Sequence, residues 1–242
     1  MSSDNIAQGF LENIPNSLRY EFKSMDPDDA AMKISRLINK GTKVLDVGCG
    51  TGVVTEIIQN VAEVNIIGIE PDELRVIKAK EKGMDIYQGF LNEDFLKEHG
   101  PFDYIIFADV LEHLSNPSEL IIMAKHGLSA DGSIIASIPN VAHWFPRTDL
   151  LRGRFDYHSC GIMDATHLRW FTRKTVKQLF ERLGFTITSL DYTVNIAHPG
   201  YNSRIPWKWM PLSLRRKFVG FLVRLWPTLF GCQFIVRASL KW

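Results

Sequence analysis

The sequence predicts an α/β fold built on a doubly wound, mostly parallel sheet of seven strands. Short apolar runs alternate with stretches of helical spacing from residue 42 onward. The chain has 242 residues, enough for one large domain with a full core, and its 45% hydrophobic and 23% charged residues are ordinary for a globular protein. Strands that alternate with helices at this spacing form βαβ units, which bury both faces of a parallel sheet.

The expected elements follow one another in a regular order. Short apolar runs predict strands at 43–47, 64–70, 84–89, 102–110 and 132–140. Helical spacing between them predicts helices at 53–61, 73–83 and 118–128. A further helix at 172–185 ends at Gly184, and two last strands are expected at 186–194 and 233–240.

The charge of the chain is unevenly distributed. The net charge is +1, but residues 201–242 carry eight Lys or Arg and no Asp or Glu. The first 200 residues carry 20 basic and 27 acidic groups. This asymmetry predicts a local contact between the tail and something anionic, and it argues against a general affinity for nucleic acid.

The cysteines and the N-terminus favour a cytoplasmic protein. Cys49, Cys160 and Cys232 lie far apart and form no C-x-x-C pair, so we expect reduced thiols. The opening stretch MSSDNIAQGFLENIPN lacks a basic segment followed by an apolar core, so no signal peptide is expected. No uncharged apolar run reaches the roughly 18 residues of a membrane-spanning helix, so none is expected.

The first predicted strand runs into a glycine-rich turn, DVGCGTG at 46–52. Glycine permits a tight turn and lets the backbone approach a ligand closely. The helix that follows offers free N–H groups and the positive end of its dipole. Glu70 stands at the end of the second strand, where a carboxylate can accept hydrogen bonds from both ribose hydroxyls of an adenosine.

Two ligand classes fit such a turn. A dinucleotide site needs a third glycine at position 53, which is Val53. VLDVGCGTG (44–52) instead resembles the first motif, [VI]-L-D-x-G-x-G-x-G, of the class I S-adenosylmethionine-dependent methyltransferases at every defining position. The resemblance covers about 40–195 and the closing strand. It implies a Rossmann-like methyltransferase fold with an antiparallel last strand, S-adenosylmethionine as cofactor and S-adenosylhomocysteine as product.

The resemblance implies a set of cofactor contacts. Gly48, Cys49, Gly50 and Gly52 would pass under the methionine part, while Asp46 would orient the turn and the cofactor's amino group. Glu70 would hold the ribose, with Pro71 and Asp72 beside the adenine. A structural glycine turn in another α/β protein is the alternative. ADVLEH (108–113) matches the family's fourth motif, so Asp109 and Val110 would face the methionine end, and His113 either begins a helix or lines the pocket.

One stretch departs from the family pattern. After the third strand the family usually carries an acid that reads the adenine amino group, but YQGFLNED (87–94) has Phe90 at that place. We therefore expect adenine recognition from Gln88, from the backbone at Gly89–Leu91 or from a later acid.

Residues 141–171 are expected to form an acceptor-site insertion. Ligands of open parallel sheets bind outside the carboxyl ends of the strands, and long loops in compact domains tend to be functional. Methyl transfer to a hydroxyl requires alignment and removal of a proton. His143 is our first candidate for the general base and His167 the second, with His158 behind them. For His167 a capping or buried structural role beside Asp164 is the alternative.

The insertion also supplies candidate acceptor contacts. Arg147, Arg154 and Arg169 could hold an anionic acceptor, or they could pair with acidic neighbours at the surface. Trp144 and Tyr157 could pack on a sugar or ring of the acceptor, or belong to the core. Tyr20 could touch the cofactor or acceptor from an N-terminal helical cap at 1–40. No His, Cys and Asp set has convincing metal spacing, so we expect no metal.

The chain is expected to divide into that cap, a cofactor-binding methyltransferase domain at 41–200, a basic amphipathic insertion at 201–230 and a closing strand at 231–242. Basic amphipathic helices with flanking tryptophans lie in membrane interfaces, so 207–226 predicts a peripheral contact with the inner face of a membrane. Packing on the domain or on a twin subunit, in a homodimer, is the alternative.

Two weaker resemblances concern the acceptor. PNVAHW (139–144) and LLRGR (150–154) resemble MetW-like proteins, and DATHLRWFT (164–172) is similar to a motif of methyltransferases from surface-glycan and secondary-metabolite clusters. They imply a small-molecule or glycan acceptor and no nucleic acid. We expect O-methylation of a sugar or other small-molecule or lipid-linked acceptor. The alternatives are a MetW-like accessory protein of methionine biosynthesis and a non-catalytic S-adenosylmethionine-binding module.

Overall fold

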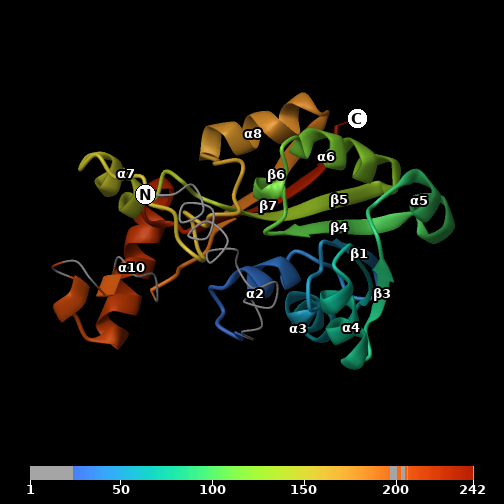
Figure 1. Ribbon diagram of the computed structural model, residues 1–242, viewed down its shortest axis with the longest axis horizontal. Coiled ribbons are helices and arrows are strands. Elements are labelled where there is room, and N and C mark those ends of the chain that lie inside the picture. Colours follow the sequence, from blue (N-terminus) through green and yellow to red (C-terminus); the bar gives the residue numbers. More distant parts are fainter. Residues whose placement is uncertain (1–23, 197–200, 203–204, 206, 242) are drawn as a thin grey trace, which may run out of the picture.

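A computed structural model describes residues 24–196, 201–202, 205 and 207–241. Within these ranges seven strands form one sheet in the order β3-β2-β1-β4-β5-β7-β6 (Figure 1). The pairs from β3 to β5 are parallel, whereas β7 runs antiparallel to both β5 and β6. The predicted doubly wound, mostly parallel sheet and its antiparallel last strand are confirmed.

The strands lie close to their predicted ranges. They are β1 (Lys43–Val47), β2 (Asn65–Glu70), β3 (Asp85–Gln88), β4 (Phe102–Ala108), β5 (Leu128–Pro139), β6 (Phe185–Tyr192) and β7 (Gln233–Leu240). The fifth strand begins at Leu128, earlier than expected, because Leu128 already pairs with Phe102 of β4, ahead of the register shift before Ser133.

The helices include several that the sequence pattern did not reveal. Those expected are α3 (Val53–Ala62), α4 (Glu73–Glu81), α6 (Pro117–His126), α8 (Arg173–Arg182) and α10 (Leu212–Leu225). The remaining ones are α2 (Ala30–Ser35), α5 (Glu93–His99), α7 (Trp144–Leu150) and α11 (Pro227–Phe230), with the 3-10 turns η1 (Leu111–His113) and η2 (Trp207–Trp209). All of these unexpected helices have seven residues or fewer, too short for a helical period to stand out.

Helices cover both faces of the sheet, and the strand residues alternate accordingly. Leu45 and Val47 of β1 face the cluster built by α5, α6 and α8. Val44 faces the opposite cluster, which α2 and α3 cover. Figure 1 shows α5, α6 and α8 on one side of the sheet and α2, α3 and α4 on the other. This double cover explains why the strands read as continuous apolar runs.

The N-terminal segment covers the sheet and not a pocket. In the described part of 24–40, Ile34 and Ile38 pack on α3 beside Ile58. None of its described residues lines the cavity presented below. The expectation of a cap over the pocket therefore fails for this part, and Tyr20 lies outside the described residues.

The segment between β6 and β7 is attached beyond the carboxyl end of β5. The side-chain amide of Asn140, directly after β5, donates to the carbonyl oxygens of Thr228 and Gly231 at 3.0 and 2.8 Å. The indole Nε1 of Trp144 donates to the hydroxyl of Tyr201 at 3.1 Å. In the described ranges, no helix has the length and apolar character that crossing a bilayer requires.

Candidate functional site

A cavity of about 1390 Å³ opens at the carboxyl ends of the parallel strands. Its walls come from the glycine turn after β1, the end of β2, the segments after β3 and β4, and the loop 158–163. Small-molecule sites commonly measure roughly 300–1,000 Å³. This cavity is therefore large enough for a nucleoside-sized ligand together with a second small molecule.

The turn at 48–52 needs its glycines. Gly48, Gly50 and Gly52 have φ angles of 72°, 59° and 76°, a left-handed backbone that favours glycine. A Cβ on Gly48 would lie 2.8 Å from a methyl carbon of Val110, and one on Gly52 would collide with the sulfur of Met84. A Cβ on Gly50 would meet no protein atom within 4 Å, although Gly50 lines the cavity. The turn thus leaves space for a ligand against its backbone at Gly50.

Glu70, at the end of β2, is held against this turn. Its Oε2 accepts a hydrogen bond from the amide of Gly50 at 2.9 Å, and its Oε1 accepts one from the amide of Asp72 at 3.1 Å. The residue is 2% exposed but lines the cavity. The backbone therefore fixes the carboxylate in one orientation beside the space that Gly50 leaves open.

Asp46 lies beneath the turn in a buried position. Its Oδ2 accepts a hydrogen bond from the hydroxyl of Thr55 at 2.7 Å, while its Oδ1 has no hydrogen-bond partner among the described residues. The pKa of Asp46 is raised to about 6, mainly by burial, which the hydrogen bond from Thr55 opposes and the charge of Glu70 reinforces. A buried carboxyl oxygen without a donor fits a residue that orients the turn and a bound amine.

Asp109 adopts a strained backbone at the end of β4. Its φ of 55° is unusual for a residue other than glycine, and such strain is common at functional sites. Its Oδ1 accepts hydrogen bonds from the hydroxyl of Ser137 at 3.0 Å and from Nε2 of Gln233 at 2.7 Å. Burial by the surrounding chain raises the pKa of Asp109. Asp109 and Val110 both line the cavity, on the side that the motif assigns to the methionine end.

Only some of the expected adenine contacts line the cavity. Pro71, Gly89 and Phe90 line the cavity, together with Leu91. Gln88 is exposed on the edge strand β3 and is not part of the lining. Asp72 also lies outside the lining, because its carboxylate accepts from the amide of Arg75 and begins α4. The expectation that Gln88 and Asp72 contact the adenine is therefore wrong. Of the expected adenine contacts after β3, only the segment 89–91 lines the cavity.

His143, our first candidate for the base, does not line the cavity. It is 1% exposed, and its Nδ1 accepts a hydrogen bond from the amide of Phe145 at 3.3 Å at the start of α7. Its ring packs beside those of Trp144 and Tyr201. A residue that begins a helix inside the core cannot reach an acceptor, so the structure argues against His143 as base.

The expected acceptor contacts also lie elsewhere. Arg147 and Arg169 donate through Nε to the carbonyl oxygens of Ala142 and Ser115, at 2.6 and 2.9 Å. Trp144 is buried against Tyr201. Arg154 and Tyr157 are exposed, and Tyr157 packs on Phe155 and Trp170. None of these five candidate acceptor contacts lines the cavity. The turns of the insertion decide where its side chains point, and no periodic pattern in the sequence reveals those turns.

The insertion nevertheless forms one wall of the cavity. His158, Ser159, Cys160, Gly161, Ile162 and Met163 line it, followed by Thr166 and His167. Part of the insertion thus borders the cavity, mostly through side chains other than those expected, and its role as the acceptor site stays a prediction. His167 is the member of the expected catalytic pair that reaches the wall.

Glu112, His113 and His167 form a cluster at this wall. The His113 and His167 rings are 4.8 Å apart, and Nε2 of His167 lies 3.9 Å from Oε1 of Glu112. Nδ1 of His113 is 3.2 Å from the carbonyl oxygen of Thr166, and Nδ1 of His167 is 3.0 Å from that of Ile162. A carbonyl oxygen can only accept, and the Thr166 hydroxyl 3.1 Å from Nδ1 of His113 donates to Asp164, so in a neutral ring this geometry favours the proton on Nδ1 and the lone pair on Nε2.

Glu112 is a functional candidate that sequence reasoning missed. It is 1% exposed, and neither carboxyl oxygen has a hydrogen-bond partner within the described part of the chain. Burial first, and then the carboxyl of Asp109, raise the pKa of Glu112 well above its ordinary value. The only available signal was its place between Asp109 and His113 in the fourth motif.

The same cluster is the one set in the described ranges that could hold a metal ion. Each of the three residues offers one ligand atom, and these atoms lie within 4.8 Å of one another. The sequence spacing does not reveal this set because His167 comes from the distant insertion.

The chain is similar to known methyltransferases. A family model described as a methyltransferase domain matches residues 19–190. A relative named ubiquinone biosynthesis O-methyltransferase, from Glaesserella parasuis, is 38% identical over 109 residues, which is 41% of this chain and 46% of the relative. A protein of the same name from Xylella fastidiosa is 33% identical over 110 residues, 43% of this chain and 45% of the relative. The match thus spans about half the length of these curated relatives.

Solved structures share the fold. A SAM-dependent methyltransferase from Archaeoglobus fulgidus superimposes with a TM-score of 0.59 at 20% identity, covering 87% of this chain and 92% of that one. A structure from Thermotoga maritima, described as a possible histamine N-methyltransferase, gives a TM-score of 0.58 at 14% identity, covering 98% and 96%.

Proposed function

We propose that this chain, which belongs to the class I S-adenosylmethionine-dependent methyltransferases, transfers the methyl group to a hydroxyl oxygen of a sugar or other small-molecule acceptor. Family membership follows from the methyltransferase model that matches residues 19–190. The cofactor is S-adenosylmethionine, and the chain is an enzyme of this class. The choice of oxygen and the acceptor class are our proposal.

The single observation that carries the choice of oxygen is the cluster at the cavity wall. A hydroxyl must lose its proton during methyl transfer, so it needs a base that an amine does not always require. Nε2 of His167 lies 3.9 Å from Oε1 of Glu112, and the ring of His113 lies 4.8 Å from that of His167, at the wall formed by the insertion. The relatives named O-methyltransferase, at 33–38% identity over part of the chain, support the same choice.

The cavity residues suit the cofactor. Gly50 leaves open space beside the turn, and Glu70 presents a fixed carboxylate to a ribose. Asp109 would hold the methionine end from the end of β4, and Asp46, which lies beneath the turn outside the cavity lining, would orient the turn. When bound, S-adenosylmethionine supplies an electrophilic methyl group on a sulfonium.

The cluster would then act on the acceptor. We propose that Nε2 of His113 takes the hydroxyl proton, because His113 is the less buried of the two histidines and lines the cavity. His167 is 5% exposed and would hold the ring of His113 in place together with Thr166. Glu112, whose pKa burial raises, would be ionised only beside the protonated imidazole, which it would then stabilise as an ion pair.

A turnover assay tests this proposal. The full chain is incubated with methyl-labelled S-adenosylmethionine and matched acceptor pairs, in which a hydroxyl is replaced by an amine. We expect label on the hydroxyl acceptors. Label only on amines would overturn the choice of oxygen. Cofactor binding without turnover on any acceptor would favour an accessory protein or a binding module.

A further inference from the structure

We propose that α10 docks the protein on an anionic lipid surface. This inference goes beyond the methyl-transfer reaction and concerns a surface that takes no part in the cofactor cavity. It is carried by an exposed apolar stripe, by the cations beside it and by the contacts that turn it outward.

The stripe consists of Leu214, Phe218, Phe221 and Leu225. These side chains are 53%, 41%, 57% and 51% exposed. Their spacing of four, three and four residues brings them onto one line of the helix, within an arc of about 60° at 3.6 residues per turn. Monomeric proteins rarely expose such a contiguous apolar patch without a partner.

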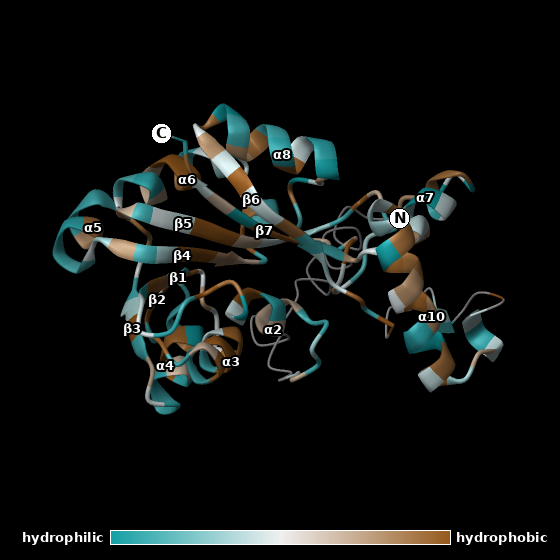
Figure 2. Ribbon diagram, turned by 180° about the vertical axis from the view of Figure 1, so that it is seen from behind, coloured by the Kyte–Doolittle hydropathy of each residue, from teal (hydrophilic) through white to brown (hydrophobic). Residues whose placement is uncertain are grey.

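A second face of α10 is buried in the protein. Val219, Leu222 and Val223 are at most 7% exposed, and Val219 and Val223 belong to the main core. The helix is therefore apolar on two faces. One packs against the core of the protein, and the other is exposed to solvent. Figure 2 shows α10 as a mixture of hydrophobic and hydrophilic residues at the edge of the molecule.

Cations and tryptophans surround the exposed stripe. Lys217 and Arg224 are exposed and lie seven residues apart, which is about two helical turns. They therefore lie on the same side of the apolar stripe. Trp209 and Trp226, at 72% and 53% exposure, stand before and after the helix. An apolar stripe with flanking cations and tryptophan at its ends is the pattern of a helix that lies in a lipid interface.

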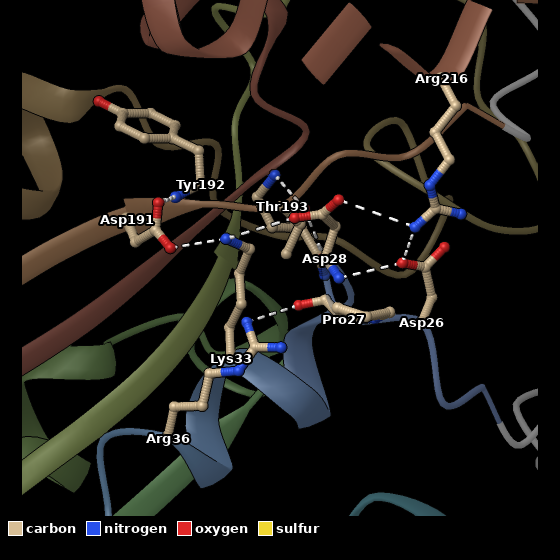
Figure 3. A network of polar contacts seen from close by, with 10 residues as sticks. Asp26, Pro27, Asp28, Lys33, Arg36, Asp191, Tyr192, Thr193 and Arg216 are labelled. Carbon is tan, nitrogen blue, oxygen red and sulfur yellow. Dashed lines mark hydrogen bonds and ion pairs between the residues drawn. The ribbon is translucent and has the colours of Figure 1, made fainter. Parts of the chain in front are cut away.

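Two other cations hold the helix in this orientation. Arg216 pairs with Asp26, and its Nη2 lies 3.7 Å from Asp28 (Figure 3). Arg215 is buried, where its Nη1 donates to Asn202 at 2.7 Å and its Nη2 to the carbonyl oxygen of Trp207 at 2.8 Å. These bonds fix the inner face of α10, so the stripe is held toward solvent.

Charge favours a lipid surface over a second copy of the chain. Residues 201–242 contain eight Lys or Arg and no acidic residue. If two stripes paired, Lys217 and Arg224 of one copy would meet cations of the other across the seam, and like charges there are destabilising. Anionic headgroups would instead neutralise both cations.

The position of the stripe suits an acceptor taken from the same surface. Asn140 ties α11, and with it the end of α10, to the carboxyl end of β5, where the cavity opens. Figure 1 shows α7 and α10 beyond that end of the sheet. The inference that the acceptor comes from the lipid surface rests on the proposed function, whereas the inferred lipid contact itself does not.

Vesicle sedimentation of the full chain tests the proposal. The probes are vesicles of phosphatidylcholine alone and of phosphatidylcholine mixed with phosphatidylglycerol. We expect the wild type to pellet with the mixed vesicles only, and less at high salt, because salt screens the cations. Phe218→Ser/Phe221→Ser should reduce the bound fraction about tenfold or more, because it removes the apolar anchor. Lys217→Glu/Arg224→Glu should abolish the preference for phosphatidylglycerol.

A matched control comes from α4, where Leu74 and Ile77 are exposed at 60% and 47% with the same spacing as the two phenylalanines. Leu74→Ser/Ile77→Ser should pellet like the wild type. The proposal is wrong if the wild type ignores the anionic vesicles, or if Phe218→Ser/Phe221→Ser binds them as well as the wild type does. A dimer in sedimentation velocity that the same variant dissolves, without vesicle binding, would assign the stripe to a second copy. S-adenosylhomocysteine binding, measured on each variant, reports folding and keeps this test separate from that of methyl transfer.

Discussion

The carboxylate of Glu70 accepts a hydrogen bond from the backbone amide of Gly50, 2.9 Å away, across the space between two neighbouring strands. This contact joins the acid that would hold a ribose to the turn that would support the methionine end. Because the amide of Asp72 binds the other carboxyl oxygen at 3.1 Å, the acid is preorganised before any ligand arrives.

Replacing Glu70 tests this preorganisation. In Glu70→Gln the side chain keeps one acceptor but loses its charge and its second acceptor oxygen. We expect S-adenosylhomocysteine to bind about tenfold more weakly, since hydrogen bonds to a charged group contribute about 1.5–3 kcal/mol. Calorimetric titration measures the effect. Glu73→Gln, at the exposed first residue of α4, is the matched control and should bind like the wild type.

Comparing alanine substitutions at Gly52 and Gly41 distinguishes the cost of side-chain crowding from the cost of backbone strain. Gly52 and Gly41 share a φ of 76°, but a Cβ on Gly52 meets Met84 and Ala79, whereas one on Gly41 meets nothing within 4 Å. Gly41→Ala should lower the free energy of unfolding by about 1–2 kcal/mol, the cost of left-handed backbone. Gly52→Ala should add a crowding cost of about 1–3 kcal/mol. Urea denaturation compares the two, and equal losses would refute the crowding at Met84.

The histidines differ in their expected effects on rate. His113→Asn should lower kcat about 100-fold or more and leave S-adenosylhomocysteine binding unchanged, because it removes the proposed base. His167→Asn should lower kcat and alter the pH profile, because it removes the ring that positions His113. His143→Ala should instead lower stability by about 1–2 kcal/mol through loss of the bond at the start of α7, with kcat intact. A large loss of kcat in His143→Ala alone would restore our first choice of base.

The buried Asp46 predicts a specific pH dependence of stability. Its folded pKa of about 6 lies above the unfolded value of 3.8, so the folded state binds the proton more tightly. The stabilising contribution is therefore present below the unfolded pKa and is lost as pH rises through about 6. The difference in unfolding free energy between wild type and Asp46→Asn should shift by about 2 kcal/mol against the wild type between pH 4.5 and pH 7. A difference that does not change with pH would contradict the raised pKa.

Much of the fold could be read from local patterns. The turn at 46–52 and Glu70 are recognisable because a strand, a glycine run and a helix follow one another within a short stretch, and the topology of a parallel sheet brings strand ends together. The antiparallel β7 required the family resemblance, because its sequence is equally apolar in either direction.

The side chains of the insertion could not be predicted in the same way. Residues 151–160 are all exposed, and no apolar period fixes which of them turn toward the cavity. His143 stands next to the strand end, yet it begins a helix of seven residues that the pattern does not reveal. Glu112 carries no sequence mark of burial, since charged residues are rarely buried without a partner.

The central claim is that the turn at Gly48–Gly52 and Glu70 hold the nucleoside of the cofactor. Calorimetric titration of the full chain with S-adenosylhomocysteine, comparing wild type with Gly50→Ala, tests it most directly. We predict saturable binding at one site in the wild type and at least about tenfold weaker binding in Gly50→Ala, whose new methyl group would enter the space beside the turn. Gly41→Ala pays a similar backbone cost away from the cavity and should bind normally. Absence of binding in the wild type, or equal affinity in Gly50→Ala, would contradict the account.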